Sequence, residues 1–290
     1  MATLTRIPSA SDGQLKQINR VAADAAEKAI NEFGLNKDQA QRVHGSAEFA
    51  ARIRAAVTTV LTDVAITDRY KDEEVESTYG YLSGYKPKPF MEQVAILQQH
   101  FPNLSHTDLS GFDIPDGAED TFAIPRFEKI APTYGQAVEI VLGLIGQTRG
   151  FYNYRKGQTG PTYLRQSERK LAALEAIGEK QEGDILVIPA QFGIRHRGRS
   201  VRRAREVFDG DEFGLGAFEV SIMLLTHPER LQHYDDLWID CAGDEFAPGA
   251  DGGFSDAPFF YFYGVKVKFF AYWIDYAYEY YGSASGFVPQ

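Results

Sequence analysis

The 290-residue sequence contains one cysteine, Cys241, so it lacks the pairs that a disulfide framework or a cysteine-built zinc site requires. No segment approaches the ~20 apolar residues that a membrane-spanning helix needs. The first residues, MATLTRIPSASDGQLKQ, have no apolar core of the kind found in secretory signals. We therefore expect a protein that does not insert into membranes and resides in the cytoplasm.

Catalytic signatures are also missing. The sequence has no Gly-x-Ser-x-Gly elbow, no Gly-Lys-Ser/Thr phosphate loop and no His-Glu-x-x-His pair. Cys241 follows the apolar stretch LWID and has no nearby histidine to activate it, so we expect it to pack in the core. The sequence predicts neither catalytic residues nor a cofactor.

The net charge of −10 argues against nucleic-acid binding through the whole surface. A local exception is RHRGRSVRRAR, from Arg195 to Arg205, which contains six arginines. It is either a phosphate or nucleic-acid patch or a solvated hairpin whose arginines pair with the acidic residues of the following EVFDGDE. We favour the hairpin because four carboxylates follow within a few residues, Glu206, Asp209, Asp211 and Glu212.

A second charged cluster is acidic and comprises Asp235, Asp236, Asp240, Asp244 and Glu245. Carboxylates at such spacing can hold calcium or magnesium, and a metal-dependent enzyme built on Asp235, Asp240 and Asp244 is one alternative. The nearby loop DGGFSD lacks the alternating acidic positions of a calcium-binding hand, and loop aspartates commonly serve turns. We therefore predict no metal site.

Apolar periodicity predicts a mainly helical region over residues 1–180. Helices are expected at 15–33, ending at Gly34, at 49–64, after Pro89, at 137–145 and at 171–177. Residues 103–132 are expected to form a loop, and GQTRGFYNYRKGQTGPT, from Gly146 to Thr162, a connector. This region is expected to dock a partner or to self-associate.

The pattern changes at about residue 180, where we place a domain boundary. DILVIPAQFGI predicts a strand, and LGAFEVSIMLL with THPERL predicts two helices. Short strands and long loops follow to residue 290. The order predicts an α+β fold.

The end of the chain is rich in aromatic residues, with five in a row from Phe259 to Tyr263. A strand points alternate side chains to opposite faces, so some of these rings must leave the core. Val265, Val267 and Phe269 alternate with lysines and predict a half-buried strand. Five rings are expected in the core, namely Phe254, Phe262, Phe269, Trp273 and Phe287. Most of the others are expected to form a binding surface, a use to which tyrosine is well suited.

Residues 181–290 resemble a C-type lectin-fold domain of the kind that diversity-generating retroelements vary. The resemblance rests on LGAFEVSIMLLTHPERL as the helical pair, DLWIDCAGDEF before the loops, APFFYFYGVKVKF as a hairpin and YGSASGFVPQ as the closing strand. It implies a fixed scaffold with a variable ligand-binding segment at about 254–290. The calcium and Glu-Pro-Asn ligand loops of sugar-binding relatives and the cysteines of formylglycine-generating relatives are absent, so neither activity is carried over.

In that family, error-prone reverse transcription rewrites template adenines, typically in AAC or AAT codons. Such changes reach Tyr, Phe, Ser, Asp and Ala but not Trp, Lys, Glu, Gln or Met. The predicted variable, ligand-binding residues are Phe260, Tyr261, Tyr263, Phe270, Tyr272, Asp275, Tyr276, Tyr278 and Tyr280. Lys266, Lys268 and Trp273 are inaccessible to this mutagenesis and, with Phe287, are the predicted scaffold of the site.

Three functional hypotheses follow. The leading one is a non-enzymatic protein that binds a protein or other macromolecule through this aromatic face. A structural protein of a phage or mobile element, with the aromatic segment buried between subunits, is the second. The metal-dependent enzyme is the third.

Overall fold

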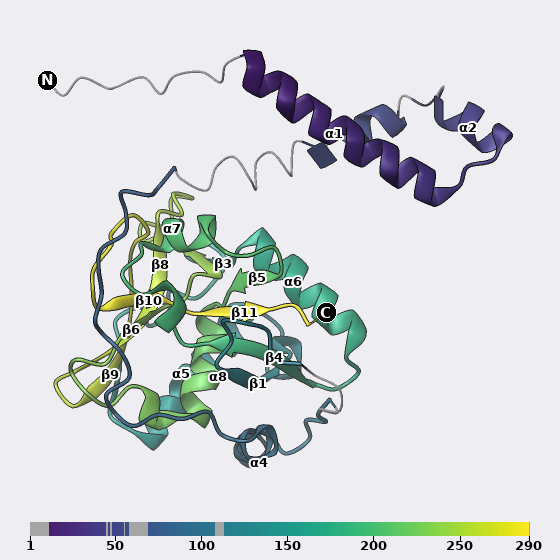
Figure 1. The fold of residues 1–290 in the computed structure, drawn as a ribbon. Coiled ribbons are helices and arrows are strands. Elements are labelled where there is room, and N and C mark those ends of the chain that lie inside the picture. Colours follow the sequence, from purple (N-terminus) through teal and green to yellow (C-terminus); the bar gives the residue numbers. More distant parts are fainter. Residues whose placement is uncertain are drawn as a thin grey trace, which may run out of the picture. The chain divides into compact units, whose positions relative to one another are not determined.

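The computed structural model describes residues 12–44, 46, 48–54, 56–57, 69–107 and 113–289. The chain divides into two compact units, Met1–Ile66 and Thr67–Gln290 (Figure 1). Both helices and sheets are present, so the protein is α+β as expected. None of the described helices combines the length and apolar character needed to cross a bilayer.

The described part of the first unit is helical. It contains α1 (Asp12–Phe33), α2 (Lys37–His44) and further helical residues at 48–54 and 56–57. Gly34, with a φ of 66°, follows α1 and supplies the left-handed conformation that commonly ends a helix. The predicted second helix extends to Val64, which lies outside the described residues. Four large apolar side chains of α1 are exposed, namely Ile18, Val21, Ile30 and Phe33.

The second unit combines five described helices with eleven strands. The helices are α4 (Phe90–His100), α5 (Tyr134–Thr148), α6 (Glu168–Lys180), α7 (Val201–Glu206) and α8 (Ala217–Thr226). The strands are β1 (Asp120–Pro125), β2 (Phe151–Asn153), β3 (Leu164–Gln166), β4 (Ile185–Gln191), β5 (Glu212–Gly214), β6 (Trp238–Asp240), β7 (Asp244–Phe246), β8 (Asp256–Tyr263), β9 (Lys266–Trp273), β10 (Tyr281–Ser283) and β11 (Ser285–Phe287).

The predicted boundary near residue 180 falls inside this second unit, between α6 and β4. β1 precedes that position and pairs along its whole length with β4, which follows it, from Asp120↔Ala190 to Pro125↔Ile185. Because this antiparallel ladder joins the two sides, the boundary between compact units lies near residue 66 instead.

The first sheet has the strand order β1-β4-β11-β5 (Figure 1). Every residue of β4 is buried, as its continuous apolar run predicts. α8 packs against α5 and β1, and all ten of its residues are buried. The second predicted helix, in THPERL, is a single 3-10 turn at Pro228–Arg230.

The second sheet contains β10-β6-β8-β7-β3, and β9 joins it by pairing with β8 and with β2. β8 and β9 form a hairpin of eight antiparallel pairs, from Asp256↔Trp273 to Tyr263↔Lys266. Gly264 and Val265 connect them with φ values of 60° and 59°, the conformation of a type I′ hairpin turn. This hairpin carries most of the aromatic segment.

Two segments that were predicted to be irregular contain strands. β1 lies within the expected loop 103–132, in which residues 108–112 are outside the described residues. β2 lies within the expected connector and runs parallel to β9, with Tyr152 opposite Lys268. Both strands pair with partners far away in the sequence, which local patterns do not reveal.

Candidate binding face

The register of the β8–β9 hairpin decides which aromatic rings face outward. Phe260 pairs with Phe269, and both are buried in the core. Their neighbours therefore point to the opposite face, where Phe259 lies across from Phe270 and Tyr261 across from Lys268. We call this side of the hairpin the aromatic face. It includes the neighbouring rings of Tyr152, Tyr154, Trp238, Tyr276, Tyr278 and Tyr280.

Most of the predicted ligand-binding residues lie on the aromatic face or in the loop that follows it. Tyr263, Tyr272, Asp275, Tyr276 and Tyr278 are exposed. Tyr261, Phe270 and Tyr280 are half-buried among neighbouring rings.

Phe260 is the exception among the predicted ligand-binding residues, because its side chain has no exposed surface. Adjacent strand residues point to opposite faces, so Phe260 and Tyr261 cannot both face a ligand. The structure corrects this assignment and makes Phe260 a core residue.

The predicted scaffold residues occupy different environments. Lys266 is exposed and Lys268 half-buried, and the Lys268 ammonium lies 4.8 Å from the centre of the Tyr263 ring, a cation–π arrangement. Trp273, predicted to be in the core, is 52% exposed and packs against Tyr272 and Tyr276. Phe287 is buried, as expected.

Aromatic residues that were not predicted as part of the site extend the face on both sides. On one side, Tyr152 of β2 and Tyr154 just after it lie along β9. The rings of Tyr154 and Phe270 are in contact, with 5.4 Å between their centres. On the other, Trp238 of β6 stacks on Phe259 at 5.8 Å. The sequence FYNY, which has three aromatic residues directly after a glycine, is the signal that could have revealed β2.

Ring contacts continue from the hairpin into the loop after β9. Tyr276 contacts Tyr278, and Tyr278 stacks on Tyr280 at 5.3 Å. Tyr280 in turn contacts Trp238, which closes the path back to the hairpin. These contacts explain why the spacing of tyrosines after Phe269 matches neither a strand nor a helix: the rings meet across a loop.

The arginine-rich segment is engaged within the protein. It does not form the expected hairpin but a 3-10 turn at Ile194–His196 and helix α7, which Ser200 caps by accepting a hydrogen bond from the Arg203 amide at 3.1 Å. The guanidinium groups pair as follows: Arg195 with Asp209 and Glu212, Arg197 with the Tyr79 carbonyl, Arg199 and Arg203 with Glu74, Arg202 with Glu73, and Arg205 with the Ala242 and Asp244 carbonyls. Neutralisation by Asp209 and Glu212 was expected, whereas Glu73 and Glu74 come from more than a hundred residues earlier.

The acidic cluster separates into groups with different roles. Asp236 accepts hydrogen bonds from the amides of Leu82, Gln232 and His233 and stabilises a turn. Asp244 is buried beside Lys170, at 3.0 Å from its ammonium. Across the described ranges, no three His, Cys, Asp or Glu side chains gather in a way that could hold a metal ion.

Asp240, another member of the acidic cluster, is buried near Arg205. Burial raises the pKa of its carboxyl to about 8, although Arg205 opposes this effect. Its neighbour Cys241 is fully buried, as predicted, and burial raises the pKa of its thiol well above the usual range. A thiol in this state is a weak nucleophile.

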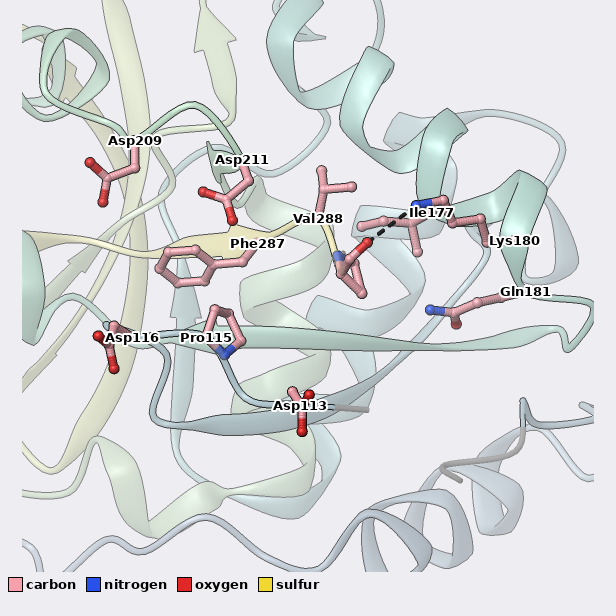
Figure 2. Close-up of a pocket in the computed structure, with 11 residues that line it drawn as sticks. Asp113, Pro115, Asp116, Ile177, Lys180, Gln181, Asp209, Asp211, Phe287 and Val288 are labelled. Atoms are coloured by element: carbon pink, nitrogen blue, oxygen red, sulfur yellow. Dashed lines mark hydrogen bonds between the residues drawn. The ribbon is translucent and has the colours of Figure 1, made fainter. Parts of the chain in front are cut away.

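A hollow of about 570 Å³ lies elsewhere on the second unit, and Phe287 forms part of its lining. Figure 2 shows Asp209 and Asp211 on one side of it and Asp113 and Asp116 on the other. Phe287, expected as scaffold of the binding site, therefore borders a separate acidic hollow and not the aromatic face.

Comparisons of this chain with protein-family models, curated proteins and solved structures find no match.

Proposed function

We propose that this protein is a non-enzymatic binding protein and that the aromatic face contacts its ligand. The observation that carries the proposal is the continuous set of exposed and half-exposed rings over β2, β8, β9 and the following loop. Large exposed apolar surfaces commonly mark interaction sites, and tyrosine provides contact area at low cost in side-chain entropy. The ligand is a protein or another macromolecule, because the face is broad.

We further propose that the scaffold is C-type lectin-like and that a diversity-generating retroelement varies the face. The hairpin supports this proposal because different residues form its core side and its surface side. Phe260 and Phe269 fill the core, while Tyr261, Tyr263 and Tyr272 can change without altering that packing. A surface that tolerates substitution over a fixed core is what such diversification requires.

A genomic observation tests the origin of the variation. Under the proposal, the coding DNA is followed by a near-repeat of the segment for residues 254–290 that differs chiefly at adenines, with a reverse-transcriptase gene nearby. Absence of both would remove diversification from the proposal, and a binding role would then depend on binding measurements alone.

The competing function is an oligomeric structural protein whose aromatic face is buried between subunits. The exposed apolar residues of α1, Ile18, Ile30 and Phe33, favour association of the chain with itself or with a partner. Light scattering with hydrogen exchange separates the two cases. A stable assembly with Tyr272 and Tyr278 protected supports the structural role, whereas exposed tyrosines in either a monomer or an assembly support binding.

A further inference from the structure

A narrow slot opens beneath the aromatic face where the loop after β9 crosses β6 and β8. Its lining residues are Val201, Asp240, Ala257, Phe259, Tyr272, Trp273, Tyr276 and Tyr281. Its free volume is about 10 Å³, close to the space that one water molecule needs. The slot is therefore suited to a small group at the end of a ligand side chain.

Asp240 is the acidic group of this slot, and among the described residues its carboxyl group interacts electrostatically with Arg205 but forms no hydrogen bond or close ion pair. The side chain is only 5% exposed. The nearest cation on α7, Arg205, donates to the carbonyl oxygens of Ala242 and Asp244, at 2.8 and 2.7 Å. A buried carboxyl group that forms no hydrogen bond within the protein is a candidate for a role in binding.

The combination of aromatic walls and a carboxylate favours a cation. Aromatic faces attract cations through their quadrupole, and the attraction increases when water is excluded. A carboxylate adds a charge-assisted hydrogen bond. The free volume suits a primary ammonium, which is compact, better than the planar guanidinium of arginine or a trimethylated amine.

We infer that this slot binds a primary ammonium group, such as a lysine side chain of the ligand, with Asp240 as its counter-ion. The inference rests on the proposed function, since the slot opens on the same face. Tyr272 and Tyr276, at the slot, belong to the predicted variable positions, whereas Asp240 and Trp273 do not. A constant anchor beneath a variable rim gives different variants of the face a shared requirement for an amine.

Binding of the ammonium is linked to pH because it requires the ionised carboxylate. The charged and titratable groups around Asp240 are Arg205 on α7, Cys241 beside it, Tyr281 on β10, and Tyr272 and Tyr276 at the slot. In the free protein the raised pKa of Asp240, about 8, leaves the carboxyl mostly protonated at pH 7. Binding then releases about 0.9 proton at pH 7, and affinity increases by up to about tenfold per pH unit below pH 8.

The experiment titrates the full-length protein with Nα-acetyl-lysine methylamide and follows tryptophan fluorescence, since Trp273 lines the slot. The norleucine analogue is the neutral control, and the arginine and trimethyl-lysine analogues test size. Asp240→Asn is expected to weaken lysine binding by about tenfold or more, because a charge-assisted contact is lost. Asp251→Asn, at an exposed acid in the loop before β8 and outside the slot, is the matched control and is expected to change affinity by less than about twofold.

Equal binding of the norleucine analogue, or unchanged affinity in Asp240→Asn, would overturn the inference, as would preferred binding of the larger cations. Calorimetry of the unmutated protein in buffers of different ionisation enthalpy provides a second test that does not depend on a variant. Release of a proton on lysine binding supports the ammonium site, and no release overturns it.

The two proposals fail in different ways. Binders selected from a displayed random-peptide library and tested on Tyr263→Ala examine the aromatic face away from the slot. If Tyr263→Ala loses those binders but the lysine analogue does not bind the unmutated protein, the ammonium site is refuted and the binding face is retained. If the lysine analogue binds through Asp240 but the library binders bind Tyr263→Ala as well as the unmutated protein, the binding face is refuted and the ammonium site is retained.

Discussion

Replacing Lys170 with methionine removes the cation from a buried polar cluster that joins α5, α6, α8 and β7. The Lys170 ammonium lies 2.6 Å from a Glu219 carboxylate oxygen, 3.0 Å from Asp244 and 2.8 Å from the Tyr134 hydroxyl. The Lys170 and Asp244 side chains are completely buried, and Glu219 nearly so. The substitution therefore leaves two carboxylates without their counter-ion.

Breaking one partner of a buried ion pair costs about 3–5 kcal/mol, so the free energy of unfolding of Lys170→Met should fall by that amount. Lys129→Met is the matched control, since Lys129 pairs with Asp184 at 2.8 Å but is half exposed. An exposed pair contributes less than about 1 kcal/mol. Urea titrations followed by circular dichroism measure both losses, and equal losses in the two variants would refute the reasoning.

The loss in Lys170→Met should also depend on pH. Burial raises the pKa of Glu219 above its ordinary value in the folded protein, and removal of the ammonium raises it further. For an acid with a raised pKa, the favourable contribution is present below the unfolded pKa and is lost as pH increases. The variant should therefore be closer to the unmutated protein at pH 5 than at pH 8; a loss that is larger at pH 5 would contradict this.

Two further predictions concern β6 and β8. Because the pKa of Asp240 is raised to about 8, its contribution to stability is lost as pH increases from about 4 to 8, so Asp240→Asn should flatten the stability curve there by up to about 1.4 kcal/mol per pH unit. Parallel curves for variant and parent in urea titrations across this window would contradict it. Phe260→Ala should lose about 3–5 kcal/mol, whereas Tyr263→Ala should change stability by less than about 0.5 kcal/mol, and similar urea midpoints for the two would refute the assigned faces.

Local sequence patterns were sufficient for the elements that are stabilised by their own periodicity. The apolar stripes predicted α5 and α6 to within a few residues, and the β-branched run in DILVIPAQFGI predicted β4. The alternation with lysines predicted that Val265, Val267 and Phe269 face the core; Val267 and Phe269 do, whereas Val265 lies in the hairpin turn and is exposed. In each case the information lies within one short segment.

Pairing between distant segments was not predictable in the same way. β1 is short and depends on β4, some sixty residues later, so its sequence alone resembles a loop. The partners of the arginine-rich segment include Glu73 and Glu74, which no local charge pattern connects to it. The domain boundary was misplaced for the same reason, because the β1–β4 ladder crosses it.

In the aromatic segment, local alternation was predictable but pairing with distant strands was not. Alternation requires that neighbouring rings in the run from Phe259 to Tyr263 face opposite sides. Only the folded structure shows that Phe260 lies in the core and that Phe259 lies on the other side, where Trp238 and Tyr281 cover it. The participation of Tyr152 and Tyr154 depends on β2, which pairs with β9 from more than a hundred residues away.

Position-by-position comparison of several sequenced alleles of this gene over residues 254–290 is the most direct test of a diversified binding face. We expect substitutions concentrated at Tyr261, Tyr263, Phe270, Tyr272, Asp275, Tyr276, Tyr278 and Tyr280. We expect none at Lys266, Lys268 or Trp273, and none at the buried Phe260. Identical alleles, or substitutions spread equally over core and surface positions, would contradict this expectation.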